Sequence, residues 1–284
     1  MKDQTSGEIL VRKASGEEVV FSEEKLKRSL SKACPDINVV NKIVNTIIHN
    51  LKPGTSTQQI YHEAFGLLEN FSRPAAGKYK LKNAIMELGP SGYPFERFIG
   101  EILKHQGFEI SIGQIVQGHC VSHEIDVIAI KGNEHYMVEC KFHNRPGYQC
   151  DVKIPLYIQA RFEDVQKRWK TIPELSEKFH QGWVVTNTRF SWDAIQYGKC
   201  IGLNLIGWDY PENGSLNDMV DTCKLYPLTC LTTLSGKEKQ NLLENKLVLC
   251  KDLVADEKAL ELAGINPRKR SAILKEAGAL CNDL

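Results

Sequence analysis

Apolar residues recur at helical spacing through the first third of the chain, after one short extended segment. Residues 9–12 and 19–21 are β-type runs on either side of Ala14-Ser15-Gly16-Glu17, which is typical of a hairpin turn. Helices are predicted after Ser22, over residues 40–51, after the capping box Ser56-Thr57-Gln58-Gln59, and after Pro74. Residues 1–92 are therefore expected to form a small hairpin followed by four helices.

Helix and strand patterns alternate in the middle of the chain, after the break at Gly89-Pro90-Ser91-Gly92. The predicted order is αβββαβαβ over residues 93–212, which indicates a mixed sheet flanked by helices. Residues 213–284 contain only short helical patterns. The expected fold is thus mixed α/β, with strands near 108–117, 124–131, 134–141, 183–186 and 203–208, and helices over 95–107, over 155–169 and after Ser191.

Composition narrows the class of protein. A length of 284 residues predicts two domains, or three small ones, at ~100–200 residues each. The 36 Lys and Arg residues nearly balance 35 Asp and Glu residues, which excludes a bulk polycation but not a local basic patch. No apolar run approaches the ~18 residues of a membrane helix, and the first residues lack a signal-peptide pattern. A soluble, cytoplasmic protein is expected.

The most informative stretch is a second predicted hairpin. Two β-type runs flank Gly132-Asn133, a pair typical of a two-residue loop. With that loop Lys131 faces Glu134, and counting outward places Asp126 directly opposite Glu139. Directly opposed residues share a face of the sheet, with Cβ atoms ~5 Å apart. The turn alone is expected to bring two carboxylates together.

These carboxylates suggest a metal site. Lys141 lies two residues after Glu139 and shares its face of the strand. Opposed carboxylates repel, which favours a divalent cation between Asp126 and Glu139, and their oxygens suit Mg²⁺ or Mn²⁺. Lys141 can orient or deprotonate a water, or stabilise charge on a phosphate. A half-solvated hairpin face, with polar residues alternating outward, is the alternative.

At these residues the sequence resembles the PD-(D/E)XK nuclease superfamily, in particular its Mrr-like restriction endonuclease branch. The acidic residue of the first helix matches Glu96, the strand Asp matches Asp126, and the Glu-x-Lys motif matches Glu139 and Lys141. The resemblance covers about residues 93–210. It implies that Glu96, Asp126, Glu139 and Lys141 are catalytic, with Asp126 and Glu139 as metal ligands. It also implies phosphodiester cleavage by an activated water, leaving a 5′-phosphate and a 3′-hydroxyl.

Two further positions bear on this resemblance. Gln159 is similar to a polar residue that the branch places on the following helix, and Ile125 stands where the superfamily's nominal Pro would be. A zinc site is a rival interpretation, because Cys140-x-x-His143 and His119-x-x-x-His123 have ligand-like spacing. Strand alternation points Cys140 to the face opposite Glu139, which weighs against zinc.

The N-terminal segment carries a second resemblance, to the ATP-cone of ribonucleotide reductases and their repressor. It rests on Val11-Arg12-Lys13-Ala14-Ser15-Gly16, on Lys25, on the helix start at Thr57, and on residues 75–81. The resemblance implies that Lys13 and Lys25 face the triphosphate of ATP or dATP, and that the backbone of Val11 and Arg12 reads the adenine edge.

This module departs from its family at two positions, since Ala14 replaces the usual Arg and Ser15 the usual Asp. The chain has no phosphate-binding loop of the Gly-x4-Gly-Lys-Ser/Thr type, so regulation by nucleotide binding is expected rather than hydrolysis. A purely structural helical domain with solvated lysines is the alternative.

A helix-hairpin-helix is suggested near the C-terminus by Gly264-Ile265-Asn266, where Asn266 replaces the second Gly of that motif. Asn tolerates left-handed backbone geometry, so the turn is retained. Arg268, Lys269 and Arg270 follow at the start of the next helix, where a DNA backbone would pass. A plain helical cap with a solvated charge run is the alternative.

Together these patterns predict three domains: an ATP-cone-like domain over 1–92, a nuclease domain over 93–212 and a DNA-binding helical segment over 213–284. The expected function is a nucleotide-regulated, Mg²⁺-dependent endonuclease of restriction or repair type that acts on double-stranded DNA. One metal site cuts one strand, so a homodimer or a nucleotide-dependent oligomer is expected for double-strand cleavage. The alternative is a non-catalytic, ATP-sensing DNA-binding regulator.

Overall fold

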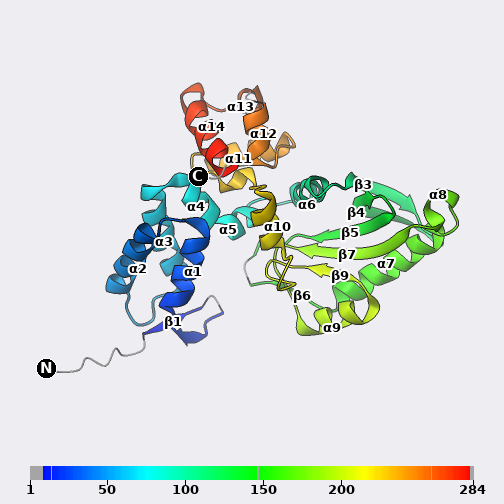
Figure 1. Cartoon of the computed structure of the whole chain (residues 1–284), viewed down its shortest axis with the longest axis horizontal. Helices are drawn as coiled ribbons and strands as arrows, with labels where there is room; N and C mark the ends of the chain where they lie inside the picture. The colour runs from blue at the N-terminus through cyan, green and yellow to red at the C-terminus, as the bar shows by residue number, and fades with distance from the viewer. Residues whose placement is uncertain (1–8, 14, 146, 257, 282–284) are drawn as a thin grey trace.

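The computed structural model describes residues 9–13, 15–145, 147–256 and 258–281. Three groups of elements follow one another along the chain: a hairpin with helices, a sheet flanked by helices, and a helical C-terminal group (Figure 1). The mixed α/β fold is confirmed. In the described part of the chain, no helix is both long and apolar enough to cross a membrane.

The N-terminal group begins with the predicted hairpin, in which Val11 of β1 (Leu10–Arg12) pairs with Val19 of β2 (Glu18–Val20). Three helices follow, namely α1 (Glu23–Ala33), α2 (Ile37–Asn50) and α3 (Thr57–Phe71). The predicted caps are confirmed, since Ser22 accepts a hydrogen bond from the Lys25 N–H, and Ser56 and Gln59 form a capping box. The apolar faces of these helices meet in one core.

The prediction of a single helix after Pro74 is wrong. The segment forms α4 (Arg73–Tyr79) and α5 (Leu81–Met86), with Lys80 between them in a non-helical conformation. Ala75 and Ala76 pack in the N-terminal core, whereas Leu81, Ala84, Ile85 and Leu88 pack with the C-terminal helices. One straight helix cannot direct its apolar face at both cores, so the chain turns at Lys80.

The central group is a five-stranded mixed sheet in the order β3-β4-β5-β7-β9. The first three strands form an antiparallel meander, and β7 and β9 then add parallel to β5. A short parallel pair, β6 (Gln149–Cys150) and β8 (Arg189–Phe190), was not predicted. The sheet strands are β3 (Glu109–Gln117), β4 (Ser122–Lys131), β5 (Glu134–Lys141), β7 (Phe179–Thr186) and β9 (Asn204–Ile206).

Helices cover both faces of this sheet. On one face lies α6 (Tyr93–His105), and on the other lie α7 (Lys153–Trp169) and α9 (Trp192–Ile201), with the short α8 (Pro173–Ser176) after α7. Successive residues of a central strand point to opposite faces of the sheet and pack against different helices. Val185 packs in the core that includes α6, and Val184 packs in the core that includes α7.

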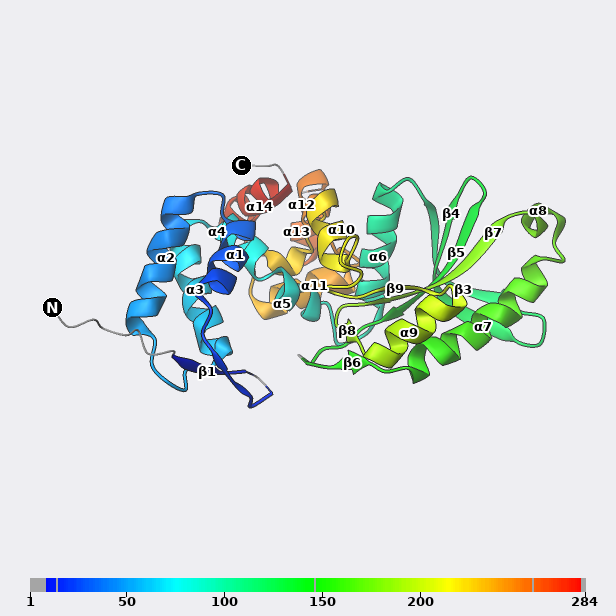
Figure 2. The same ribbon diagram turned by 60° about the horizontal axis from the view of Figure 1, so that its bottom comes forward.

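The C-terminal group comprises α10 (Leu216–Cys223), η1 (Leu228–Cys230), α11 (Gly236–Glu244), α12 (Cys250–Ala255), α13 (Lys258–Leu262) and α14 (Pro267–Cys281). Its apolar residues share one core with α5 and α6. In both views α10 lies between the N-terminal helices and the sheet (Figure 2). The boundaries predicted at residues 92 and 212 stay predictions, and this shared core joins segments on both sides of each.

Candidate active site where two strands diverge

The predicted hairpin register is confirmed from the turn outward. Gly132 adopts φ 56° in the loop, Lys131 pairs with Glu134, and the ladder continues to Val127 and Val138. There the regular pairing of β4 with β5 ends, one step before Asp126 and Glu139. The Cys140 N–H donates instead to the Asp126 carboxylate, at 2.7 Å. A side chain thus replaces a main-chain acceptor, and the two strands diverge where their carboxylates begin.

The Glu139 side chain is buried and holds two cations. Its Oε1 lies 2.6 Å from Lys141 Nζ, and its Oε2 lies 2.7 Å from Arg161 Nη1. Arg161 comes from α7 and also donates to the main-chain carbonyl of Glu124. The residue is only 4% exposed, so the two cations offset much of the cost of burying its charge.

Arg161 is the site residue that the sequence interpretation missed. A signal was present, because residues 158, 161, 162 and 165 fall at the i, i+3, i+4, i+7 spacing of the apolar face of α7. A charged side chain within such a stripe points toward the sheet and requires a buried partner. The polar residue singled out instead, Gln159, donates to Glu163 on the same helix.

Glu96 and Asp126 carry excess negative charge. Burial, and then the charge of Glu139, raises the pKa of Asp126 to about 6. Burial, together with Asp126, Glu124 and Glu139, raises the pKa of Glu96 to about 7, although Lys141 opposes this. Glu96, the predicted acidic residue of this helix, lies in the first turn of α6. The charges of Asp126 and Glu139 act on it there. The four predicted catalytic residues thus lie within range of one another's charge, and the carboxylates outnumber the cations Lys141 and Arg161.

The carboxylate pair suits an oxygen-seeking cation. Mg²⁺ is usually bound by one or two carboxylates together with water and substrate phosphate, so Asp126 and Glu139 form an appropriate donor set. Within the described residues, no group of three or more His, Cys, Asp or Glu side chains is placed to hold a metal ion. A cation here would therefore rely on water or substrate for its remaining ligands, and would share Glu139 with Lys141 and Arg161.

The residues of the rival zinc interpretation have other contacts. His123 Nε2 lies 2.8 Å from an Asp164 oxygen, and the His119 N–H donates to the Asp164 carbonyl. Cys140 packs in the core that includes α6, on the face opposite Glu139. His143 Nε2 lies 3.3 Å from Cys150 Sγ. The structure does not bring His119, His123, Cys140 and His143 together.

The predicted nucleotide residues are only partly gathered. The Arg12 N–H donates to the Thr55 carbonyl at 3.0 Å, which places the hairpin against the start of α3 at Thr57. Val11 is buried in the N-terminal core, and Lys13 forms an ion pair with Glu17 at 3.0 Å. Lys25 lies in the first turn of α1. The departure noted at Ala14 falls outside the described residues.

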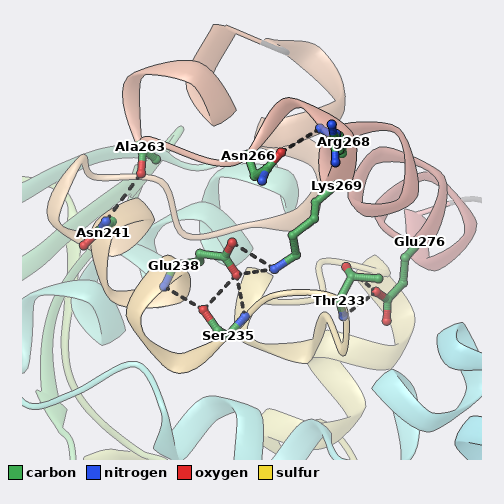
Figure 3. A network of polar contacts seen from close by, with 9 residues as sticks. All are labelled: Thr233, Ser235, Glu238, Asn241, Ala263, Asn266, Arg268, Lys269 and Glu276. Atoms are coloured by element: carbon green, nitrogen blue, oxygen red, sulfur yellow. Dashed lines mark hydrogen bonds and ion pairs between the residues drawn. The ribbon is translucent and has the colours of Figure 1, made fainter.

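The predicted DNA-binding hairpin is held by contacts within itself and with α11 (Figure 3). Its left-handed residue is Gly264, at φ 71°, whereas Asn266 accepts a hydrogen bond from the Arg268 N–H at 3.0 Å. Asn266 thus caps α14 instead of supplying left-handed geometry. Lys269 Nζ lies 2.7 Å from Glu238 on α11, and Arg270 Nε donates to the Ile265 carbonyl.

Of the three predicted phosphate contacts, Arg268 is the one whose side chain is exposed, while Lys269 and Arg270 are half-buried. Lys269 is held in the network of Ser235 and Glu238, and Arg270 lies 3.5 Å from Glu261. A phosphate would have to compete with these carboxylates for two of the three cations.

Comparisons with known proteins give family matches for the central part of the chain and for its C-terminal part. Residues 89–211 match the restriction endonuclease family, and residues 226–281 match the family described as AF1548-like, C-terminal. An uncharacterized protein of Archaeoglobus fulgidus is 39% identical over 180 residues, which is 63% of this chain and 97% of the relative. The crystal structure of the protein of unknown function AF1548 is 36% identical, with a TM-score of 0.56.

That match covers 67% of this chain and 98% of AF1548, so nearly the whole of the relative is represented here. The chain therefore belongs to the AF1548-like family, and its central part is a restriction-endonuclease-like domain.

Proposed function

We propose that the protein is a metal-dependent endodeoxyribonuclease of restriction or repair type. The observation that carries the proposal is the divergence of β4 from β5 at Asp126 and Glu139, with Lys141 2.6 Å from Glu139. The restriction-endonuclease-like domain supports it, since this arrangement lies within that domain. Double-stranded DNA is the proposed substrate.

Asp126 and Glu139 would hold Mg²⁺ or Mn²⁺, which polarises the phosphate and lowers the pKa of a bound water. Lys141 Nζ lies beside Glu139 and can orient the attacking water or stabilise charge on the phosphate. Glu96, with a pKa of about 7, can exchange a proton at neutral pH. The proposed products carry a 5′-phosphate and a 3′-hydroxyl.

Arg161 has a positioning role in this proposal. Its guanidinium contacts both Glu139 and the carbonyl of Glu124, which precedes Asp126 by two residues. It therefore links the ends of both metal-binding strands to α7. The guanidinium also offsets part of the cost of burying the Glu139 carboxylate.

We further propose that the three predicted domains have separate roles. Residues 1–92 would bind ATP or dATP as a regulatory ligand, which the hairpin lying against the start of α3 supports. Residues 93–212 would cleave DNA, and residues 213–284 would contact duplex DNA at the hairpin of Gly264 and Asn266. Arg268 would be its main phosphate contact, because Lys269 and Arg270 already have carboxylate partners. A homodimer or a nucleotide-dependent oligomer would allow both strands to be cut.

Supercoiled plasmid provides the direct test. The wild-type protein should nick it with Mg²⁺ or Mn²⁺ and not with EDTA, and Asp126→Asn should slow nicking at least ~100-fold. Glu134→Gln is the matched control, because Glu134 is a carboxylate at the other end of β5 and pairs with Lys131. DNA binding without metal-dependent nicking would instead identify the non-catalytic regulator.

A further inference from the structure

A cavity of about 780 Å³ lies at the junction of the N-terminal helices with the sheet. Its walls come from α1 and α4, from the start of α5, from the end of α9, from the loop Trp208–Glu212 after β9, and from α10. The volume falls in the ~300–1,000 Å³ range of small-molecule and cofactor sites. The cavity is separate from the strand edge at Asp126 and from the hairpin at Lys13, neither of which contributes to its lining.

Four lysines line this cavity, namely Lys32, Lys78, Lys82 and Lys199. In the part of the chain that the structure describes, no carboxylate lies within ion-pair distance of any of them. Two of the four are instead placed over aromatic rings, with Lys82 Nζ 5.6 Å from the centre of the Trp208 ring and Lys78 Nζ 5.6 Å from that of Tyr226. Such contacts orient an ammonium group without neutralising it.

The charge of Lys82 is only partly compensated by nearby carboxylates. Burial, and then the nearby charge of Arg189, lowers the pKa of Lys82, and Asp209 only partly opposes this. Asp209 is itself bound to Arg189, at 2.7 Å. The negative charge of a phosphate next to Lys82 would stabilise its protonated form.

Four acidic residues also line the cavity, namely Asp209, Glu212, Asp218 and Asp221. Asp218 caps α10 by accepting from Ser215, so it is already engaged. Asp221 has a pKa raised by burial, with Lys32 and Lys78 opposing the shift. The Asp221 carboxylate accepts a hydrogen bond of 3.4 Å from the Asn217 side-chain amide. A carboxylate can accept several hydrogen bonds, so Asp221 can still accept one from a ligand hydroxyl or amino group. The lysines can therefore attract an anion and Asp221 can accept hydrogen bonds, with Trp208, Tyr79 and Leu81 as apolar surface.

We propose that this cavity binds a nucleoside phosphate, whose phosphate group contacts Lys82 and Lys199 and whose hydroxyl or amino groups donate to Asp221. A bare inorganic anion would use the lysines only, and an apolar ligand would use neither the lysines nor Asp221. Because both the N-terminal helices and the sheet domain line the cavity, the ligand contacts both parts at once. It therefore stabilises their present arrangement by linkage.

Calorimetry on the full chain, without DNA or divalent metal, tests the proposal. ATP and AMP should bind, and the double variant K82Q/K199Q should weaken binding at least ~10-fold, the loss expected for charge-assisted contacts. Because residues 1–92 are also proposed to bind ATP at the hairpin, the titrations are repeated in a background that carries Lys13→Gln and Lys25→Gln. In that background one nucleotide should still bind, and K82Q/K199Q should weaken its binding by the same factor. Lys199→Gln alone, at an exposed side chain, keeps the test valid if Lys82→Gln does not fold.

Three results would overturn the proposal. The first is no binding of ATP or AMP at 1 mM, a concentration chosen as ~1,000-fold above a micromolar Kd. The second is binding lost only in the Lys13 and Lys25 variant, which would assign the nucleotide to the hairpin. The third is inorganic triphosphate binding as tightly as ATP, which would leave the nucleoside without a role. The test is independent of the proposed nuclease activity, because calorimetry measures nucleotide binding and no cleavage.

Discussion

Two lysine–glutamate pairs, one at the candidate active site and one in the C-terminal helices, have similar geometry and different surroundings. Glu139 and Lys141 meet at 2.6 Å on the diverging strand, and Glu238 and Lys269 meet at 2.7 Å between α11 and α14. The Glu139 side chain is 5% exposed and that of Glu238 is 19% exposed. The first pair has further carboxylates beside it, whereas the second closes a network with Ser235.

The different surroundings shift the pKa values of carboxyl groups at the two sites in opposite directions. At the strand edge, burial and the Glu139 charge raise the pKa of Asp126 to about 6. At the C-terminal hairpin, burial would raise the pKa of Glu238, but hydrogen bonds from Lys269 and Ser235 outweigh it and the net shift is downward. An excess of negative charge marks a place that favours a cation, while a balanced pair marks a structural contact.

The largest expected effect separates the two pairs by cleavage. Glu139→Gln should reduce the plasmid nicking rate at saturating DNA at least ~100-fold, because it removes a metal ligand. Glu238→Gln makes the same chemical change in the other pair and should leave that rate within about twofold. Similar losses in both variants would contradict the distinction.

Arg161 sharpens the comparison through stability. Arg161→Ala leaves a buried carboxylate with Lys141 alone, so the metal-free protein should lose about 3–5 kcal/mol of unfolding free energy. Mg²⁺ should stabilise this variant more than the wild type, since a cation at Glu139 replaces the missing charge. Urea unfolding with and without Mg²⁺ measures both effects.

Arg161→Lys is the control for this experiment, because it keeps the charge and loses the two-pronged contact with Glu139 and Glu124. An intermediate loss of stability is expected. If Arg161→Ala matched the wild type in metal-free stability, the ion pair to Glu139 would contribute nothing and the positioning role would be wrong.

Asp126→Asn should have a smaller and opposite effect on the metal-free protein. The folded-state pKa of Asp126 is about 6, above its usual 3.8, so ionisation disfavours the folded state as pH rises through this interval. Asn cannot ionise and still accepts from the Cys140 N–H. The variant should therefore gain at most ~3 kcal/mol over the wild type at pH 7.5, and only ~0.5 kcal/mol near pH 4.

Thermal unfolding in EDTA across pH 4–7.5 provides this measurement, with Asp193→Asn, in the exposed first turn of α9, as control. The same titration predicts that Mg²⁺ affinity rises as pH increases through about 6, because the metal must displace a proton from Asp126. A pH-independent difference between variant and wild type would contradict the assignment of the shift to Asp126.

The smallest expected effects lie in the C-terminal hairpin. Lys269→Ala should cost about 0.5–1 kcal/mol of stability, because it breaks a partly exposed ion pair. Arg268→Ala should be neutral in stability and should lower the salt slope of DNA binding by ~0.9, the value for one phosphate contact. Fluorescence anisotropy with two unrelated duplexes at several salt concentrations distinguishes these outcomes. An unchanged slope for Arg268→Ala would leave the hairpin as a structural cap.

Sequence determined the features that depend on near neighbours. The register from Lys131–Glu134 to Val127–Val138 follows from a two-residue turn, because each further pair is fixed by the one before it. The caps at Ser22, Ser56 and Ser191 likewise involve residues within one helical turn. These interactions are encoded within a few residues, so the pairing as far as Val127 and Val138 could be predicted. The direct opposition of Asp126 and Glu139 could not, because the strands diverge at that point.

Only the tertiary structure decided which distant groups meet. Arg161 reaches Glu139 across 22 residues, and Lys269 reaches Glu238 across 31 residues. The turn at Lys80 and the junction cavity likewise depend on which cores the helices join. Apolar periodicity states that a helix face is buried but not against which partner, because any complementary surface satisfies the same pattern. The charges that a helix meets are therefore fixed by packing direction, which is set by the whole fold.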